Sequence, residues 1–249
     1  MDRALYLAMS GAKQDMYALQ VRANNLANAN TTGFRADMEQ ARSMQAYGEG
    51  LPTRVFSMTE RPGYSFRQGS TITTGRDLDV AIEGEGWIAV LDGTGQEGYT
   101  RAGHLKIDQT GILQNDYGQS ILGDNDAPII VPLPISKIEV GKDGTVSVLP
   151  QGAPAEAIEE IGRIKLVRPD NRQLFKDNNG VFKPIQPGAV FDADASVTLL
   201  SGALEGSNVN PIEEMTSLID LQRHFEMQVK LMKTAEELDQ ASASLMRLG

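Results

Sequence analysis

The side chains with the clearest chemical potential are the chain's two histidines, His104 and His224. A zinc site or a catalytic triad needs further ligands or partners at a suitable spacing. His104 follows a glycine at the start of an expected strand, and His224 lies in a long helical pattern, with no third partner near either one. We therefore expect neither a metal site nor a triad.

Two acidic clusters, at residues 124–126 and 192–194, are similar in composition to calcium-binding loops. Neither has the D-x-[DN]-x-[DN]-G run with its later glutamate, so we expect these side chains to cap turns. Residues 84–86 read Gly-Glu-Gly but lack the third glycine that opens a helix in a dinucleotide-binding loop.

Paired carboxylates offer acid–base chemistry in principle, and Asp77 with Asp79 and Glu83 with Glu85 are such pairs. Pairs at alternate strand positions are common on the surface of so acidic a chain. We therefore expect no catalytic residue, no cofactor and no metal.

The charge balance argues against two classes of partner. The 249 residues carry a net charge of −10 and contain no run of lysine or arginine, which disfavours nucleic acid and anionic membrane surfaces. The chain has no cysteine, which excludes disulfides and thiolate chemistry. We see no apolar run long enough for a cleaved signal peptide or a membrane span, and expect no membrane insertion.

The elements that would position any site begin with an N-terminal helix. Its apolar residues repeat with alternating spacings of four and three, the pattern of a coiled-coil seam: Leu5, Met9, Ala12, Met16, Leu19, Ala23 and Leu26. The polar run 28–33 then ends the helix, because Gly33 accepts a positive φ and the short amides and hydroxyls cap free backbone groups. Phe34 follows as an apolar anchor.

A second helix is predicted at the other end, from about residue 211 to 248. Asn210 suits the N-cap, Pro211 the first helical position and Glu213 the third residue after the cap. Its apolar residues form two offset stripes, which indicates more than one neighbour. The first stripe contains Met215, Leu218, Phe225, Val229 and Met232, and the second contains Leu231, Ala235, Leu238 and Leu245.

Between the helices the period changes to that of short strands separated by glycine-rich turns. No helical pattern separates the strands, which favours an antiparallel sandwich or barrel. The fold class is thus α+β, with terminal coiled-coil helices around a β-rich middle. We expect an N-terminal assembly helix at 1–36, an extended connector at 37–76, the β domain at 77–206 and a C-terminal assembly helix at 207–249.

A helix of this length with one apolar seam is only marginally stable on its own. Two arrangements would cover the seams: an ordinary two-helix hairpin on a β domain, or a bundle of helices from many chains.

Four blocks of the sequence resemble motifs of the flagellar basal-body rod and hook family, and they occur in family order: residues 23–35, 78–87, 98–103 and 205–215. Within the family, residues 1–4, 51–54 and 223–228 look most like the proximal rod members. Distal rod members are the near alternative, although they usually carry an aromatic pair where this chain has Trp87-Ile88.

The resemblance implies a structural subunit of the rod that crosses the periplasm as a drive shaft. Implied partners are other proximal rod subunits, the distal rod protein, copies of this chain and the flagellar type III export apparatus, which passes the chain unfolded and without a cleaved signal peptide. We expect the assembly interface to contain Leu5, Met9, Met16, Leu19, Leu26, Met215, Leu218, Phe225, Val229 and Met232. A helix-end motif is expected at Asn24, Asn25, Asn28, Gly33, Phe34, Asn210 and Pro211.

Two other functions belong to different classes. A secreted β-rich enzyme acting on polysaccharide would need a deep acidic cleft, but one tryptophan and six tyrosines offer little for a sugar-binding groove. A cytoplasmic coiled-coil adaptor with a β head would not pass through the flagellar export apparatus.

Overall fold

A computed structural model describes residues 2–45, 55–154, 156–177 and 179–246. Segment 51–54, which contributed to the resemblance above, lies outside the described residues, as do residues 247–249. The side chain of Leu245 is likewise outside the described part.

The chain divides into two compact units. Residues 1–29, 36–65 and 209–249 form one, called here the helical unit, and residues 30–35 and 66–208 form the other, called the β unit. Both ends of the sequence therefore belong to the same unit.

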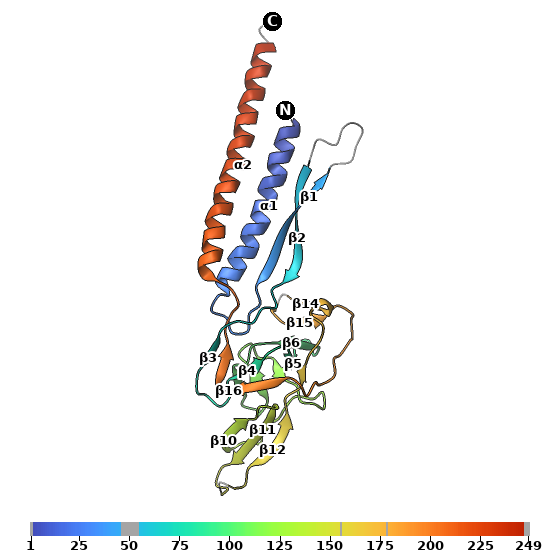
Figure 1. Ribbon diagram of the computed structural model, residues 1–249, viewed down its shortest axis with the longest axis vertical. Coiled ribbons are helices and arrows are strands. Elements are labelled where there is room, and N and C mark those ends of the chain that lie inside the picture. Colours follow the sequence, from blue (N-terminus) through green and yellow to red (C-terminus); the bar gives the residue numbers. More distant parts are fainter. Residues whose placement is uncertain (1, 46–54, 155, 178, 247–249) are drawn as a thin grey trace. The chain divides into compact units, whose positions relative to one another are not determined.

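The helical unit contains α1 (Asp2–Ala27), α2 (Pro211–Met246), β1 (Asp37–Gln45) and β2 (Val55–Tyr64). The two helices lie side by side and antiparallel (Figure 1), with Gly11 of α1 beside Gln228 of α2 and Arg22 of α1 bonded to Glu214 of α2. α2 begins at Pro211 because the Asn210 side chain accepts a hydrogen bond from the Ile212 amide, 3.2 Å, as an N-cap does.

Small side chains dominate the buried side of α1: Ala8, Ala12, Ala18, Val21 and Asn25. Such residues let neighbouring elements approach closely, and α1 contacts α2 on one side and β1 and β2 on another. The buried residues thus differ from the expected heptad seam, of which only Ala12 is fully buried. Two packing partners cover a wider arc of the helix than a single coiled-coil seam would.

Over residues 37–76 we expected an extended connector, and the structure differs. β1 and β2 pair in antiparallel register from Asp37 opposite Tyr64 to Gln45 opposite Val55, with a bulge between Met38 and Gln40. This ladder satisfies the backbone polar groups of a polar segment whose local pattern carries no strand signal. Pairing between these two neighbouring stretches, which the local pattern of either one does not encode, makes the segment a pair of strands.

The β unit is built from short antiparallel strands. In chain order they are β3 (Thr71–Thr73), β4 (Val80–Glu83), β5 (Trp87–Leu91), β6 (Glu97–Thr100), β7 (Leu105–Ile107), β8 (Leu113–Asn115), β9 (Ser120–Ile121), β10 (Ile135–Val140), β11 (Thr145–Pro150), β12 (Glu159–Arg163), β13 (Leu166–Val167), β14 (Leu174–Lys176), β15 (Phe182–Pro184), β16 (Thr198–Ser201) and β17 (Ala203–Glu205), with a 3-10 helix, η1, at Asn171–Gln173.

The largest sheet runs in the order β14-β15-β6-β5-β9-β8-β7, and β13 pairs with β5. β10, β11 and β12 form a separate sheet, in which a hairpin joins β10 to β11. Ile88 and Leu113 of the largest sheet and Val146 of the β10–β12 sheet share one buried core with Val80 of β4 and with Ile164, which lies between β12 and β13. The predicted α+β class, with helices at both ends of an antiparallel β-rich middle, is confirmed.

Candidate assembly surface and buried polar clusters

The side of α1 that faces away from α2 and the β1–β2 pair carries large apolar residues. Tyr6, Met9, Met16 and Tyr17 are each about half exposed or more, with Met16 at 58%. Lys13 lies among them, its ammonium 5.8 Å from the centre of the Tyr17 ring. Side chains of this kind on one face indicate a surface that another chain covers.

α2 carries more uncovered apolar residues than α1 does. Two groups on different sides of the helix are exposed: Ile212, Met215, Ile219 and Val229, which extend from the N-terminal end to the middle, and Met227, Leu231 and Leu238 further along. α1 covers only one side of α2, where Leu218, Leu221, Phe225 and Met232 are half-buried. The two groups point in different directions because the helix turns about 100° per residue.

The ten residues expected at the assembly interface therefore fall into two sets. Six are half-buried within the helical unit, namely Leu5, Leu19, Leu26, Leu218, Phe225 and Met232. Four are exposed, namely Met9, Met16, Met215 and Val229. The half-buried set contributes to packing inside one chain, and the exposed set is the part available to another chain.

The asparagines at the end of α1 take part in a buried polar cluster of the helical unit. Asn25 is 1% exposed. Its amide nitrogen donates to the Asp37 carbonyl, 2.9 Å, and to Glu214 Oε1, 3.2 Å, while its oxygen accepts from the Asp37 amide, 2.9 Å. Asn24 donates to the Asp37 carboxylate, 3.0 Å, and Asn28 donates to the Asn24 carbonyl, 2.9 Å. These bonds join α1, β1 and α2.

Arg22 completes that cluster. Its guanidinium lies 3.2 Å from both Glu39 and Glu214. Burial disfavours the charged form, but the two carboxylates outweigh it and raise the pKa of Arg22. The residues that tie α1, β1 and α2 together are thus polar and lie at one end of α1.

Gly33 and Phe34 belong to the β unit. Gly33 has a φ of 69°, and its amide donates to the Glu205 carbonyl, 2.8 Å. A Cβ at this position would lie 2.3 Å from the Arg101 carbonyl carbon, so only glycine fits. The Phe34 ring lies under the Lys176 ammonium, which is 3.8 Å from its centre.

Next to them, Arg35, Arg101 and Glu205 form a buried ionic cluster. Arg35 is 1% exposed, and its Nη1 lies 2.7 Å from Glu205 Oε1. Arg101 Nη1 donates to Glu205 Oε2, 2.8 Å, and Nη2 donates to the Gly84 carbonyl, 2.7 Å. Burial lowers the pKa of Arg35, Glu205 raises it, and Arg101 lowers it further, so the net direction is down.

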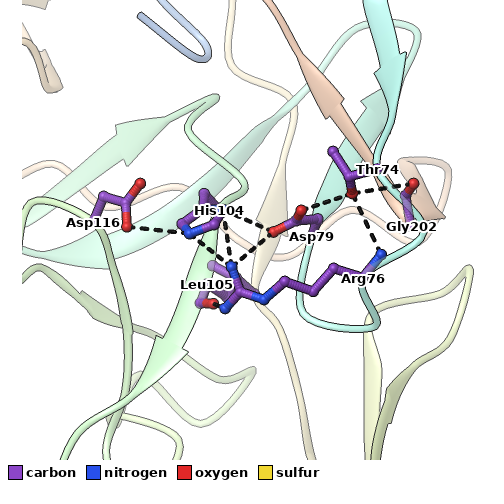
Figure 2. Close-up of polar contacts among 7 residues, drawn as sticks. All are labelled: Thr74, Arg76, Asp79, His104, Leu105, Asp116 and Gly202. Atoms are coloured by element: carbon purple, nitrogen blue, oxygen red, sulfur yellow. Dashed lines mark hydrogen bonds and ion pairs between the residues drawn. The ribbon is translucent and has the colours of Figure 1, made fainter.

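His104 lies in a different cluster of the β unit, centred on the buried carboxylate of Asp79 (Figure 2). Asp79 is 2.8 Å from His104 Nδ1 and 3.3 Å from Arg76 Nη1, and it accepts a 2.7 Å bond from the Thr74 hydroxyl. His104 Nε2 lies 3.4 Å from Asp116. Asp79 thus has three polar partners that fix the start of β4, an arrangement that explains its burial without a reaction.

Several other acidic groups considered above have structural partners as well. Asp194 accepts from the Ser196 amide, 2.8 Å, Asp126 binds Lys165, 2.5 Å, and Glu85 pairs with Arg168, 2.7 Å. His224 is exposed on α2. No group of three or more acidic or histidine side chains in the described part of the chain is placed to hold a metal ion.

Sequence reasoning did not identify Asp37, Glu214, Arg101 or Glu205 as members of polar clusters. A signal was present, because Arg35, Arg101 and Glu205 each lie in one of the blocks that resemble the rod and hook family, at 23–35, 98–103 and 205–215. No single block shows that these charges meet; only the folded chain brings them together.

Two terminal helices with uncovered apolar faces, joined to a β unit, define a class of subunit that assembles with other chains. Comparisons with known proteins give the family. Residues 5–35 match "Flagella basal body rod protein", residues 81–148 match "Flagellar hook protein FlgE/F/G D1 domain", and residues 200–245 match "Flagellar basal body rod FlgEFG protein C-terminal".

Similar proteins align over almost the whole chain. The flagellar basal-body rod protein FlgF of Salmonella typhimurium is 39% identical over 95% of each chain, and that of Caulobacter vibrioides is 37% identical over 100% of this chain and 99% of its own. The rod protein FlgG of Bacillus subtilis is 30% identical over 99% of this chain and 100% of its own. The chain belongs to the flagellar basal-body rod protein family.

Among the described helices, none combines the length and the apolar character that crossing a membrane requires.

Proposed function

We propose that this structural subunit of the flagellar rod assembles through the exposed apolar faces of α1 and α2, within the proximal part of the rod. The observation that carries the proposal is that the two helices leave large apolar residues uncovered even when packed on each other and on the β1–β2 pair. Met16 on α1 and Ile212 on α2 are 58% and 76% exposed. Burying each such side chain fully gains about 1.5–3 kcal/mol.

The direction of these residues supports contacts with more than one neighbour. Ile212, Met215 and Ile219 lie on one side of α2, whereas Met227, Leu231 and Leu238 lie on another, and Met9 and Met16 lie on α1. A subunit in a closed tube has neighbours on several sides, and each exposed group would be covered by a different one. The tube then transmits torque as a drive shaft.

The proposed partners are copies of this chain and of related rod subunits. Similarity to both FlgF and FlgG proteins extends over both helical ends, so neighbours of either kind would present comparable helices. We propose further that the chain leaves the cytoplasm through the flagellar export apparatus without a cleaved signal peptide, and that it acts without catalysis. Family membership supports each of these points.

Assembly would also complete the folding of the helical unit. Ordering a long helix costs conformational entropy, and burying apolar surface on only one side of the helix offsets part of this cost. Burial of the exposed faces by neighbours supplies the rest, and this restricts ordering of the ends to the growing tip of the rod.

Amide hydrogen exchange tests this coupling. In the isolated full chain we expect fast exchange along most of α1 and α2 and slow exchange in β5, which is buried. In purified rods the amides of both helices should exchange much more slowly, with β5 unchanged. Slow exchange in both helices of the isolated chain would contradict the coupling.

A further inference from the structure

A hollow of about 450 Å³ opens beside the Arg35–Arg101–Glu205 cluster of the β unit. Arg35, Arg101 and Trp87 are its buried lining, and Phe66 forms an apolar wall. The exposed side chains Glu85, Arg168 and Asp170 also line it, so the hollow is open to solvent.

The buried charges at this hollow do not balance. Arg35 and Arg101 carry two positive charges and share one carboxylate, that of Glu205. Glu205 is fully engaged, since its Oε1 also accepts from the Gly69 amide, 3.0 Å. A buried charge without a counter-charge is strongly unfavourable, so the pair of guanidiniums is suited to one more anion.

Hydrogen-bonding groups on both arginines remain unused. Arg35 Nε and Arg101 Nε have no hydrogen-bond partner among the described residues. Arg35 Nη1 is in the same state, because its 2.7 Å contact with Glu205 is an ion pair without hydrogen-bond geometry. Buried donors of this kind are normally satisfied, so a missing acceptor is the simplest explanation.

The other charges that line the hollow do not supply this acceptor. Glu85 is paired with Arg168 at 2.7 Å, with both side chains more than half exposed. Asp170 is exposed and accepts a 3.0 Å bond from the Arg172 amide, which caps η1. Water screens both carboxylates, so they contribute little electrostatic stabilisation to the buried guanidiniums.

From the excess buried charge and the unused donors at this hollow, we infer that it is a binding site for a carboxylate. A guanidinium presents a planar fork of donors that matches a carboxylate, as the Arg101–Glu205 pair already shows. One negative charge balances the excess, whereas a phosphate dianion would exceed it. The burial that lowers the pKa of Arg35 is consistent with an arginine whose counter-ion is incomplete.

The sole tryptophan makes the site directly observable, because the Trp87 ring lies 5.6 Å from the Arg101 guanidinium and lines the hollow. We would titrate the ¹⁵N-labelled full chain with sodium acetate, balanced with sodium chloride to constant ionic strength, and follow the single indole N–H resonance. A saturable shift with acetate is expected. An equal response to chloride alone would overturn the inference.

Two variants and a control localise the binding. Arg35→Gln should weaken acetate binding by roughly tenfold or more, because it removes a charged donor. Glu85→Gln, at an exposed position that does not threaten folding, should tighten it about two- to fivefold by freeing Arg168. Lys137→Gln, at an exposed residue outside the hollow's lining, should change nothing. Binding that is indifferent to both Arg35→Gln and Glu85→Gln would place acetate elsewhere and overturn the assignment.

The source of the carboxylate is distinguished by a second ligand, a short blocked peptide whose only charge is one glutamate side chain. Tighter binding of the peptide than of acetate supports an acidic side chain of a neighbouring chain as the occupant. Binding of acetate with exclusion of the peptide supports a small free carboxylate. Failure of both ligands to shift the Trp87 resonance overturns the proposal.

Discussion

Replacing Met16 or Ile219 by aspartate is expected to abolish swimming without unfolding the chain. Both side chains are more than half exposed, so the substitution should change the free energy of unfolding by less than about 0.5 kcal/mol. In the rod the same position would be covered, and an unpaired charge buried at an interface costs several kcal/mol. A loss of that size weakens association by several orders of magnitude and stops rod growth.

A matched control lies outside the helical faces. Gln109→Asp adds the same charge at an exposed turn between β7 and β8 and removes no apolar contact, so it should support near-normal swimming. Leu19→Asp and Phe225→Asp should also block motility while the β unit stays folded, because both residues are half-buried in the packing that the helical unit forms on assembly. Normal swimming of strains carrying Met16→Asp and Ile219→Asp would refute the proposed faces.

The second large effect is a loss of stability of the β unit when its buried ionic cluster is changed. Glu205→Gln removes the one carboxylate that Arg35 and Arg101 share and leaves two guanidiniums buried without a counter-charge. Removing one partner of a buried ion pair costs about 3–5 kcal/mol. Urea unfolding followed by the fluorescence of Trp87, which lies in the β unit, measures this loss directly.

Glu139→Gln provides the comparison, because it removes one partner of an ion pair whose side chains are both about half exposed. We expect it to cost at most about 1 kcal/mol. If Glu205→Gln destabilised the β unit no more than Glu139→Gln, the buried cluster would not contribute the stability that we expect from its burial.

Local signals in the sequence were sufficient for the start of α2 and for the β-rich character of the middle of the chain. Asn210 and Pro211 combine a capping side chain with a ring that pre-sets the first helical φ, and both act within one turn of chain. The turn between β10 and β11 is similarly local, since Asp143 accepts from the Thr145 amide and hydroxyl across the connection. Interactions of this range can be predicted from residue types and spacing.

Interactions between distant parts of the chain could not be predicted in this way. Asn25 is polar, yet it is buried because Asp37 and Glu214 satisfy its amide. Hydrophobic periodicity assigns buried positions to large apolar residues, so it selected Met9 and Met16, which are exposed, and overlooked Ala8 and Ala18. The pairing of β1 with β2 was missed although the two strands are close in the sequence, because their residues carry no strand signal.

The labelling of single cysteines is the most direct test of assembly through the helical faces. The natural chain has no cysteine, so Met16→Cys, Ile219→Cys and Gln109→Cys each give one reactive thiol, the last at an exposed turn between β7 and β8. We expect all three thiols to react readily with a maleimide in the isolated chain. In purified rods the thiols at 16 and 219 should react many times more slowly, while the thiol at 109 remains reactive. Equal reactivity of the helical thiols before and after assembly would contradict the account.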